Sequence, residues 1–334
     1  MVLLLLTIAS GNFEPVNLPS IIITGDGSID PADVPINRTG NVYTLIGNIS
    51  DYSLNVQCNN ITVDGAGYTL QTKKVSQNHG ISIEANGVTV KNIRIDGYYS
   101  VGINIGGSFN TITKNSIPTD IGTGINLQGD YNNITRNTLD NSGSGIDIAG
   151  KYNNIIGNVI RKRGHGIWID VDFAYFNNIV GNNISSGGTA IVLNAISMYS
   201  GIALSGYNAF YLNNFESVYS QPVSLIGGAN HSAKYAVNIF DNRSVGNYWS
   251  DYSGKDANHD GIGDTPYVIG ENITDRYPLM APFDIDNNPI VVVPLPIPSP
   301  AEPFPTTLAV ASAVTVTAII AVGLLVYVRK RKRF

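Results

Sequence analysis

GISI at Gly80–Ile83 is the first of several copies of one phrase that recurs as far as residue 193. The later copies are GINI at Gly102–Ile105, GINL at Gly124–Leu127, GIDI at Gly145–Ile148 and GIWI at Gly166–Ile169. A divergent copy, AIVL, follows at Ala190–Leu193. Their first isoleucines are 21 to 24 residues apart, a spacing that is typical of solenoid repeats. The chain therefore contains a repeat domain, and the repeat decides its fold.

The residues inside each copy alternate between apolar and polar, as in Ile103-Asn104-Ile105 and Ile146-Asp147-Ile148. A period of two is the mark of a half-buried β-strand, and β-branched side chains pack well on a pleated surface. Gly and Asn occur in every unit, and both tolerate the left-handed backbone of a sharp corner. One coil cannot bury its own apolar face, whereas stacked coils bury it by parallel pairing. The sequence therefore predicts an all-β parallel β-helix.

A second phrase keeps the same spacing and ends on asparagine. It reads NNIT at Asn59–Thr62, FNTITKN at Phe109–Asn115, YNNITRN at Tyr131–Asn137, YNNIIGN at Tyr152–Asn158 and FNNIVGN at Phe176–Asn182. Asparagines at one repeat position stack in a β-helix, so their amides can form a hydrogen-bonded ladder. We expect such a ladder through Asn115, Asn137, Asn158, Asn182 and Asn213, with a structural role.

Composition shifts divide the chain into segments. We expect residues 1–10 to be the remnant of a signal peptide, residues 18–52 to cap the first coil, and residues 53–284 to form the β-helix, with a distinct block at 246–280. Residues 285–305 are dense in proline and predict an extended stalk.

The C-terminal end predicts a membrane anchor. Leu308–Val328 is a run of 21 residues without a charge, so we expect a single transmembrane helix at 306–328. The basic tail at 329–334 follows at once, and such tails stay in the cytoplasm. The body of the protein is therefore expected at the cell surface. N-x-S/T sequons agree with a glycoprotein there, at Asn37, Asn48, Asn60, Asn133, Asn183, Asn230, Asn242 and Asn272.

The charge balance argues against nucleic acid as a partner. The chain has 20 Lys and Arg against 25 Asp and Glu, a net charge of −5. Five of the basic residues lie in Arg329–Arg333, so the remainder has 15 basic and 25 acidic residues. An acidic body repels phosphate backbones. Cys58 is the single cysteine, so no internal disulfide is expected.

One acidic loop has the pattern of a calcium site. Asp256, Asn258, Asp260 and Asp264 follow D-x-N-x-D-G-x-x-D, which places oxygen ligands at alternate positions before a glycine turn. The twelfth position is Tyr267, where an EF-hand has a bidentate glutamate, so other ligands or water would complete the shell. A polar turn that closes the solenoid is the alternative interpretation.

This region also carries a family resemblance. The segments NYWSDYSG, DANHDGIGDTPYVI and DRYPLM within residues 246–280, after NNIT-type coils, resemble the NosD family. The likeness is greatest to archaeal surface forms with a proline-rich stalk and a C-terminal anchor. The resemblance implies a right-handed parallel β-helix with repeats of the carbohydrate-binding and sugar-hydrolase type. It also implies a periplasmic role in supplying copper to nitrous oxide reductase.

The residues themselves do not predict a copper site. Soft or imidazole ligands are few and scattered through the chain. They are Cys58, Met198, Met280, His79, His165, His231 and His259. No two of them form a compact ligand motif, so copper delivery remains an alternative that rests on the resemblance.

The stretch RKRGHGIWIDVD at Arg161–Asp172 has a possible enzymatic interpretation. Gly164-His165-Gly166 is similar to the GHG of polygalacturonase-type hydrolases, and Asp170 and Asp172 are candidate carboxylates for glycoside cleavage. Arg161 is a candidate base for a lyase. However, His165 occupies the repeat position of Thr123 and Ser144, so the sequence favours a variant of the repeat over a catalytic site.

The outward residues of the phrase offer a binding surface instead. Stacking is expected to align Asn104, Asn126, Asp147 and Trp168 in one column, which begins at Ser82. Amides and carboxylates beside an indole can hold a sugar chain. We therefore expect a membrane-anchored surface protein that binds an extracellular polysaccharide or serves as a structural module. A polysaccharide lyase or hydrolase and a copper-delivery factor remain the alternatives.

Overall fold

The computed structural model describes residues 15–118, 122–141, 143–162, 164–170, 173–194, 207–217, 222–226, 238–270 and 273–292. The chain divides into two units, Met1–Val293 and Pro294–Phe334. The predicted signal remnant, most of the stalk, the transmembrane helix and the basic tail lie outside the described residues. Within the described ranges, no helix is long and apolar enough to cross a membrane.

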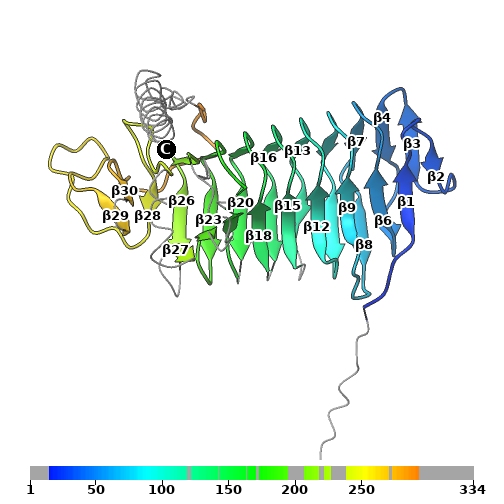
Figure 1. Cartoon of the computed structure of the whole chain (residues 1–334), viewed down its shortest axis with the longest axis horizontal. Helices are drawn as coiled ribbons and strands as arrows, with labels where there is room; N and C mark the ends of the chain where they lie inside the picture. The colour runs from blue at the N-terminus through cyan, green and yellow to red at the C-terminus, as the bar shows by residue number, and fades with distance from the viewer. Residues whose placement is uncertain are drawn as a thin grey trace, which may run out of the picture. The chain divides into compact units, whose positions relative to one another are not determined.

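Three long sheets form the first unit (Figure 1). In spatial order the first sheet contains β2 (Ile29–Asp30), β1 (Ser20–Ile23), β6 (Ser53–Val56), β9 (His79–Ile83), β12 (Val101–Ile105), β15 (Thr123–Leu127), β18 (Ser144–Ile148), β21 (Ile167–Asp170), β24 (Ile191–Asn194) and β27 (Val223–Ile226). The second contains β25 (Ala209–Tyr211), β22 (Asn178–Val180), β19 (Asn154–Ile156), β16 (Asn133–Thr135), β13 (Thr111–Thr113), β10 (Thr89–Lys91), β7 (Thr62–Asp64), β4 (Val42–Leu45) and β3 (Ile36–Thr39).

The third sheet contains β28 (Tyr248–Trp249), β26 (Asn214–Ser217), β23 (Asn183–Ser186), β20 (Val159–Lys162), β17 (Thr138–Asn141), β14 (Ser116–Ile117), β11 (Arg94–Gly97), β8 (Thr69–Thr72) and β5 (Ile49–Ser50). A separate hairpin pairs β29 (Tyr267–Gly270) with β30 (Ile273–Asp275). Each full turn gives one strand to each long sheet, as β12, β13 and β14 do. The predicted all-β parallel β-helix is therefore confirmed.

The repeat phrase sets the register of the first sheet. Ile103 pairs with Ile125, Ile125 with Ile146, and Ile146 with Ile167. All four side chains are fully buried, so identical residues stack along the core. Because the strand period is two, a register error of one residue would turn the whole stack outward. The even spacing of the phrase thus sets both the turn length and the contents of the core.

The two ends of the solenoid differ in how they are closed. At the first end, β2 and β3 pair antiparallel with β1 and β4, within the segment predicted as a cap. At the other end the core changes from isoleucine to aromatic residues. Trp249 is 1% exposed and stacks on Tyr267 of the hairpin, with ring centroids 4.4 Å apart. Large rings here fill the space where no further turn is stacked.

The segment 281–292 runs back along the solenoid from its C-terminal end. The backbone N–H of Phe283 donates to Oδ1 of Asn214 at 2.7 Å, and Nδ2 of Asn214 donates to the carbonyl of Phe283 at 2.8 Å. Ile290 lies against Gly157 and Gly181, whose added Cβ atoms would be 3.3 and 2.6 Å from its Cδ1. The first residues of the predicted stalk therefore lie against the β-helix.

Candidate functional site

The predicted outward column is present on the first sheet. Ser82 pairs with Asn104, Asn104 with Asn126, Asn126 with Asp147, and Asp147 with Trp168. All five side chains are partly exposed. Each stands on an adjacent strand, and neighbouring strands are roughly 4.8 Å apart. The sheet therefore presents a continuous row of amide, carboxylate and indole groups along the solenoid.

Hydrogen bonds within this row hold several of its groups in place. Nδ2 of Asn126 donates to Oδ1 of Asn104 at 2.8 Å, and the Thr123 hydroxyl donates to Oδ2 of Asp147 at 2.9 Å. An amide carries two donors and two acceptor positions, so a bond to one neighbour leaves capacity for a ligand. The row is thus ordered by the protein and is still able to bind.

Trp168 has an imidazole beside it. The His165 ring lies 5.4 Å from the Trp168 ring, centroid to centroid, with the planes tilted by 56°. Nδ1 of His165 is buried and has no hydrogen-bond partner among the residues that the structure describes. His165 accepts the Gly145 N–H through its backbone carbonyl, so it continues the repeat position of Ser144. Trp168 of the repeat phrase and His165, which lies just before the phrase, therefore form a tilted pair of rings.

The residues of the enzymatic hypothesis are only partly placed. Asp170 ends β21 on the first sheet, where it pairs with Asn194, whereas Arg161 lies on β20 of the third sheet, opposite Asp140. Asp172 lies outside the described residues. A glycosidase needs two carboxyl groups flanking the scissile bond. The described residues supply Asp170 alone from this stretch, so catalysis stays a prediction.

The acidic loop folds as a turn that binds its own backbone. Asp256 accepts the backbone N–H groups of Asp260 at 3.2 Å and Gly261 at 2.9 Å, and Asp264 accepts that of Ala257 at 2.9 Å. Asn258 donates its side-chain amide to Asp260 at 2.9 Å. The loop thus brings the predicted ligands into one turn, but among the described residues no group of three His, Cys, Asp or Glu could hold a metal ion. Calcium stays a prediction.

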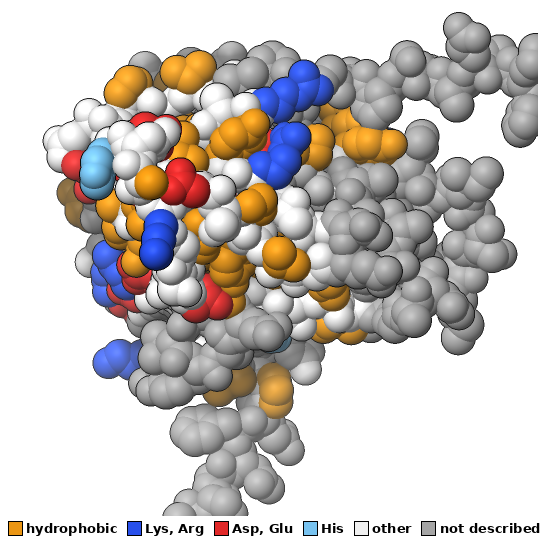
Figure 2. Space-filling view, turned by 90° about the vertical axis from the view of Figure 1, so that its left-hand side faces the viewer, with side chains coloured by type: hydrophobic (Ala, Val, Ile, Leu, Met, Phe, Trp, Pro, Cys, Tyr) orange, Lys and Arg blue, Asp and Glu red, His pale blue; other side chains and the backbone are white. Residues whose placement is uncertain are grey.

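The surface around that loop is mixed in character. Figure 2 views the molecule from the end that carries the β29–β30 hairpin, and acidic, basic and hydrophobic side chains are interspersed over the described part of this face. Tyr267 donates its hydroxyl to Asp251 at 3.0 Å. The side chains of Tyr267 and Asp251 at this end are therefore bonded to each other.

The predicted asparagine ladder is confirmed and extends further than expected. Side-chain amide bonds of 2.9 to 3.1 Å run from Asn115 through Asn137, Asn158, Asn182 and Asn213 to Asn247. A second buried ladder, of Asn110, Asn132, Asn153, Asn177, Asn208 and Asn238, supports the neighbouring corner. Hydrogen-bonded buried amides rigidify the corners of the coil, although Nδ2 of Asn110 and Nδ2 of Asn153 have no hydrogen-bond partner among the described residues. These asparagines have structural roles.

The first ladder ends on a buried acid. Asp275 accepts N–H groups from the Trp249 indole at 2.8 Å, the Asn247 backbone at 2.7 Å and the Tyr277 backbone at 3.1 Å. Burial raises the pKa of Asp275 to about 6, although these hydrogen bonds act in the opposite direction. The repeat pattern does not predict the position of Asp275, because this residue follows the solenoid in the sequence and folds back onto it.

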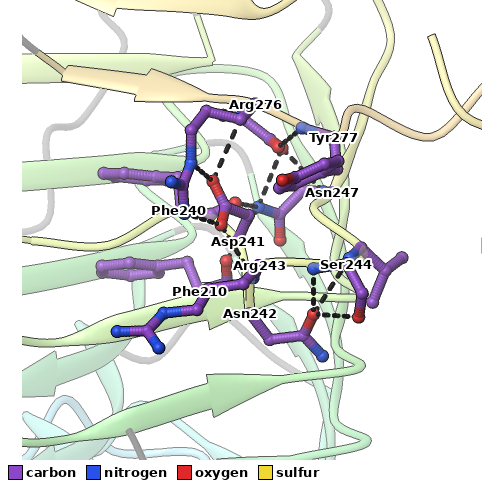
Figure 3. A network of polar contacts seen from close by, with 11 residues as sticks. Phe210, Phe240, Asp241, Asn242, Arg243, Ser244, Asn247, Arg276 and Tyr277 are labelled. Carbon is purple, nitrogen blue, oxygen red and sulfur yellow. Dashed lines mark hydrogen bonds and ion pairs between the residues drawn. The ribbon is translucent and has the colours of Figure 1, made fainter. Parts of the chain in front are cut away.

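An ion pair lies beside that acid (Figure 3). The Arg276 guanidinium donates to both carboxylate oxygens of Asp241, which is 1% exposed, at 2.8 and 2.5 Å. Burial raises the pKa of Asp241, but the Arg276 guanidinium and backbone N–H donors outweigh it, and the pKa lies below its ordinary value. Asn247 bonds the carbonyls of Phe210 and Phe240 in the same network. The C-terminal block is thus fastened to the last turn by polar contacts.

The structure also contains a column of aromatic rings on the surface that was not predicted. Five rings stack face to face, with centroids 4.8 to 5.5 Å apart and planes within 13° of parallel. They belong to Phe109, Tyr131, Tyr152, Phe176 and Tyr207. Each has a left-handed backbone, with φ between 53° and 60°. The signal was available, because an aromatic residue opens four of the asparagine phrases.

The candidate copper ligands do not come together in the described residues. Cys58 is half-buried with its thiol directed at the Asn59 carbonyl, His79 lies on β9, and His259 lies in the acidic loop. Met280 is 38% exposed. Met198 and His231 lie outside the described residues. Copper binds where several thiolate, thioether or imidazole ligands converge, and the described part of the chain does not fit that requirement.

Comparison with known proteins identifies a family. A family model described as "Periplasmic copper-binding protein (NosD)" matches residues 32–254, from the N-terminal cap to the turn that contains Trp249. No curated protein matches the chain. The matched range contains the outward column and both asparagine ladders, and it ends just before the acidic loop.

Proposed function

The chain belongs to the NosD family, and we propose that it is an extracytoplasmic binding protein that holds a glycan chain along the outward face of its first sheet. One observation carries the proposal: Asn104, Asn126, Asp147 and Trp168 stand in register on adjacent strands. Because the row presents one polar or aromatic group at each turn, it can contact successive units of a polymer that lies along the solenoid. Its groups are of the kind that sugar hydroxyls and ring faces recognise.

The energetics favour a polymer over a single small sugar. Each partly exposed amide or carboxylate that bonds the ligand contributes a net hydrogen bond of about 1 kcal/mol, and the half-buried indole adds apolar contact of similar size. A single contact of this strength gives little affinity, because association itself costs several kcal/mol. Several contacts along one rigid column overcome that cost, since the protein orders the column before the ligand arrives.

The family is described as periplasmic, which supports a location outside the cytoplasm. The uncharged run at 306–328 and the basic tail at 329–334 support tethering to a membrane by the C-terminus. A structural surface module without a ligand could have the same anchor. A glycan-binding experiment distinguishes this module from a glycan-binding protein.

Calcium at the acidic loop is a further part of the proposal. Asp256, Asn258, Asp260 and Asp264 share one turn, and Gly261, with φ of 86°, gives the sharp bend. Calcium would replace the backbone donors that the carboxylates now accept. Addition of calcium chloride should raise the Tm of the full-length chain, and Asp260→Asn should remove that rise. An equal Tm in calcium and in chelator would exclude the site.

Copper delivery is a second candidate function because the family description names that metal. Equilibrium dialysis of the full-length chain against Cu(I) and Cu(II) measures it directly. We expect no site of high affinity, because the described His, Cys and Met residues are dispersed. Stoichiometric copper retained against a chelator would favour delivery over glycan binding.

The experiment for the main proposal is a glycan-array screen of the full-length chain in detergent. It is run beside Trp168→Ala and beside Tyr98→Ala, a matched change at an exposed ring outside the column. Binding that Trp168→Ala abolishes and Tyr98→Ala preserves supports the proposal. Binding that neither variant changes would mean that the ligand binds outside the column. If the chain binds no glycan, the alternative of a structural surface module is favoured.

A further inference from the structure

The sequons among the described residues fall into two groups by the exposure of their asparagines. Three asparagines are exposed, namely Asn37, Asn48 and Asn60. Three are half-buried, namely Asn133, Asn183 and Asn242. The sequons at Asn230 and Asn272 lie outside the described residues. The exposed group is confined to the N-terminal cap and the first full turn, so the structure distinguishes one end of the solenoid from the rest.

Two of the exposed asparagines lie at strands that end their sheets. Asn37 is on β3, which pairs with β4 on one side only, opposite Thr44. Asn48 directly precedes β5, the last strand of the third sheet. Oδ1 of Asn48 accepts the backbone N–H of Thr69 at 2.9 Å, a bond that does not use Nδ2. At both positions the described structure leaves one side free of a neighbouring strand.

The third exposed asparagine lies at a corner between two glycines. Gly40, Asn60 and Gly87 each lie two residues before the first paired residue of a strand, in β4, β7 and β10. All three have left-handed backbones, with φ of 60°, 56° and 67°. They are therefore stacked equivalents, one turn apart. Because glycine has no side chain, neither adjacent corner position carries a side chain that would obstruct a large group on Asn60.

Two of the half-buried asparagines have neighbours on both sides. Asn133 stands between Thr111 and Asn154, and Nδ2 of Asn154 donates to Oδ1 of Asn133 at 2.9 Å. Asn183 is on β23, which pairs with β20 on one side and β26 on the other. Neighbouring strands are roughly 4.8 Å apart. A large group on either asparagine would therefore crowd the side chains of the adjacent turns.

The third half-buried asparagine is fixed in a tight turn (Figure 3). Oδ1 of Asn242 accepts the backbone N–H groups of Ser244 at 3.1 Å and Val245 at 2.9 Å. The Ser244 hydroxyl donates to the same oxygen at 2.8 Å. The hydroxyl that makes this segment a sequon is therefore already bonded to its own asparagine.

We propose that Asn37, Asn48 and Asn60 carry N-linked glycans, whereas the three half-buried sequons stay unmodified. An N-linked glycan is bulky and hydrophilic, so the folded protein must leave it solvent and lateral room around the asparagine. Among the described sequons, the exposed group alone offers both. The hydroxyl residue of each exposed sequon is also accessible, since Thr39 and Ser50 are exposed and Thr62 is partly exposed.

The donor for this modification is a lipid-linked oligosaccharide. Nδ2 of the asparagine forms a bond to the anomeric carbon of the first sugar, the bond from that carbon to the lipid phosphate breaks, and the amide releases one proton. The transfer takes place outside the cytoplasm, because sequons are acceptors in secreted proteins. The inference therefore rests on the extracytoplasmic location in the proposed function and is independent of the outward column.

Glycopeptide mapping tests the proposal on the full-length chain, purified in detergent from membranes of the organism that makes it. Protease digestion and mass spectrometry give the share of copies that carry a glycan at each sequon. We expect a glycan in most copies at each exposed asparagine and unmodified peptides at the half-buried ones. A glycan on any half-buried member, or an unmodified asparagine in most copies at any exposed one, overturns the proposal.

Variants at one sequon show whether the link is made by recognition of the motif. Thr39→Ala retains Asn37 but removes the hydroxyl, so the intact chain should lose the mass of one glycan. Thr39→Ser keeps a hydroxyl and should keep the glycan. Asn133→Gln is the matched change in the half-buried group and should remove no glycan. A chain that loses no glycan in Thr39→Ala would contradict N-linkage at Asn37.

A membrane-impermeant amine-reactive label on intact cells tests the location separately, at the exposed Lys73 and Lys74. A chain that is labelled there but carries no glycan at any sequon would keep the extracytoplasmic location and discard this inference. A chain that is neither labelled nor glycosylated would overturn both. Glycan binding that needs Trp168 is measured on the array and does not depend on either result.

Discussion

Asn247 donates its side-chain amide to the buried carboxylate of Asp275 at 3.2 Å, so the ladder of asparagines ends on an acid. Every earlier step of the ladder joins two amides, each of which can both donate and accept. A carboxylate only accepts, and it receives the indole N–H of Trp249 as well. The last turn and the C-terminal block are therefore locked together at this atom.

Replacement of Asp275 by Asn should destabilise the protein. The new amide nitrogen would face the N–H of Tyr277 in one orientation and the donors of Asn247 and Trp249 in the other, so at least one buried N–H would lose its acceptor. The expected loss is about 2 to 4 kcal/mol in the free energy of unfolding. Urea unfolding measures it, with Asp284→Asn on the exposed surface as control. A midpoint within error of the wild type would show that the acid does not hold the cap.

The same acid predicts a dependence of stability on pH. Burial raises the pKa of Asp275 from 3.8 to about 6, so the folded protein binds its proton at a higher pH than the unfolded chain. Its contribution to stability is fully present below pH 3.8 and is lost as pH rises to about 6, by roughly 3 kcal/mol in total. Asp241 acts in the opposite direction, because its pKa is lowered.

Comparison with Asp275→Asn isolates this contribution from that of Asp241. The free energies of unfolding of the two proteins, measured between pH 4 and pH 7, should differ by an amount that changes between pH 4 and 6 and is constant above. A difference that is independent of pH would show that the carboxyl titrates normally in the folded state.

The middle of the ladder should be sensitive to truncation. Asn158 is fully buried, donates to Asn182 and to the Ile134 carbonyl, and accepts from Asn137. Asn158→Ala leaves those partners unsatisfied and should cost about 3 kcal/mol. Asn154→Ala on the outward face is the matched control, with an expected cost under about 1 kcal/mol. Equal midpoints of thermal unfolding for the two variants would contradict a structural ladder.

The segment 281–292 should detach when its apolar contact is removed. Ile290 fits against Gly157 and Gly181, where the absence of side chains leaves room for it. Ile290→Asp should speed amide hydrogen exchange in this segment at least tenfold and leave the solenoid unchanged. Val291→Asp, at a position that is 63% exposed, should have little effect. Similar exchange in both variants would show that Ile290 does not hold the segment.

The repeats made most of the fold predictable. The nearly equal spacing of Ile103, Ile125 and Ile146 implies stacking, and stacking implies the registered column and the asparagine ladder, all of which the structure contains. The right-handed twist of the coil stays an expectation from the family. Equal spacing was also the signal for the aromatic column, but Phe109 and its equivalents were interpreted only as parts of corner phrases.

Contacts that do not repeat from turn to turn could not be predicted from the sequence. The bond from Trp249 to Asp275 joins residues 26 positions apart with no counterpart in other turns. Likewise, the contact of Ile290 with Gly181 depends on a chain reversal near Phe283 that no periodicity marks. For the candidate site, the sequence predicted which groups share the column, but not that Asn126 bonds Asn104 or that His165 flanks Trp168. Those details depend on side-chain rotamers.

The central claim is that the outward column of the first sheet binds a glycan, and calorimetric titration of the strongest array ligand tests it most directly. We expect Trp168→Ala to weaken binding to the full-length chain at least tenfold, and Tyr98→Ala to leave the affinity within twofold of the wild type. Equal affinity of Trp168→Ala and wild type would contradict the claim.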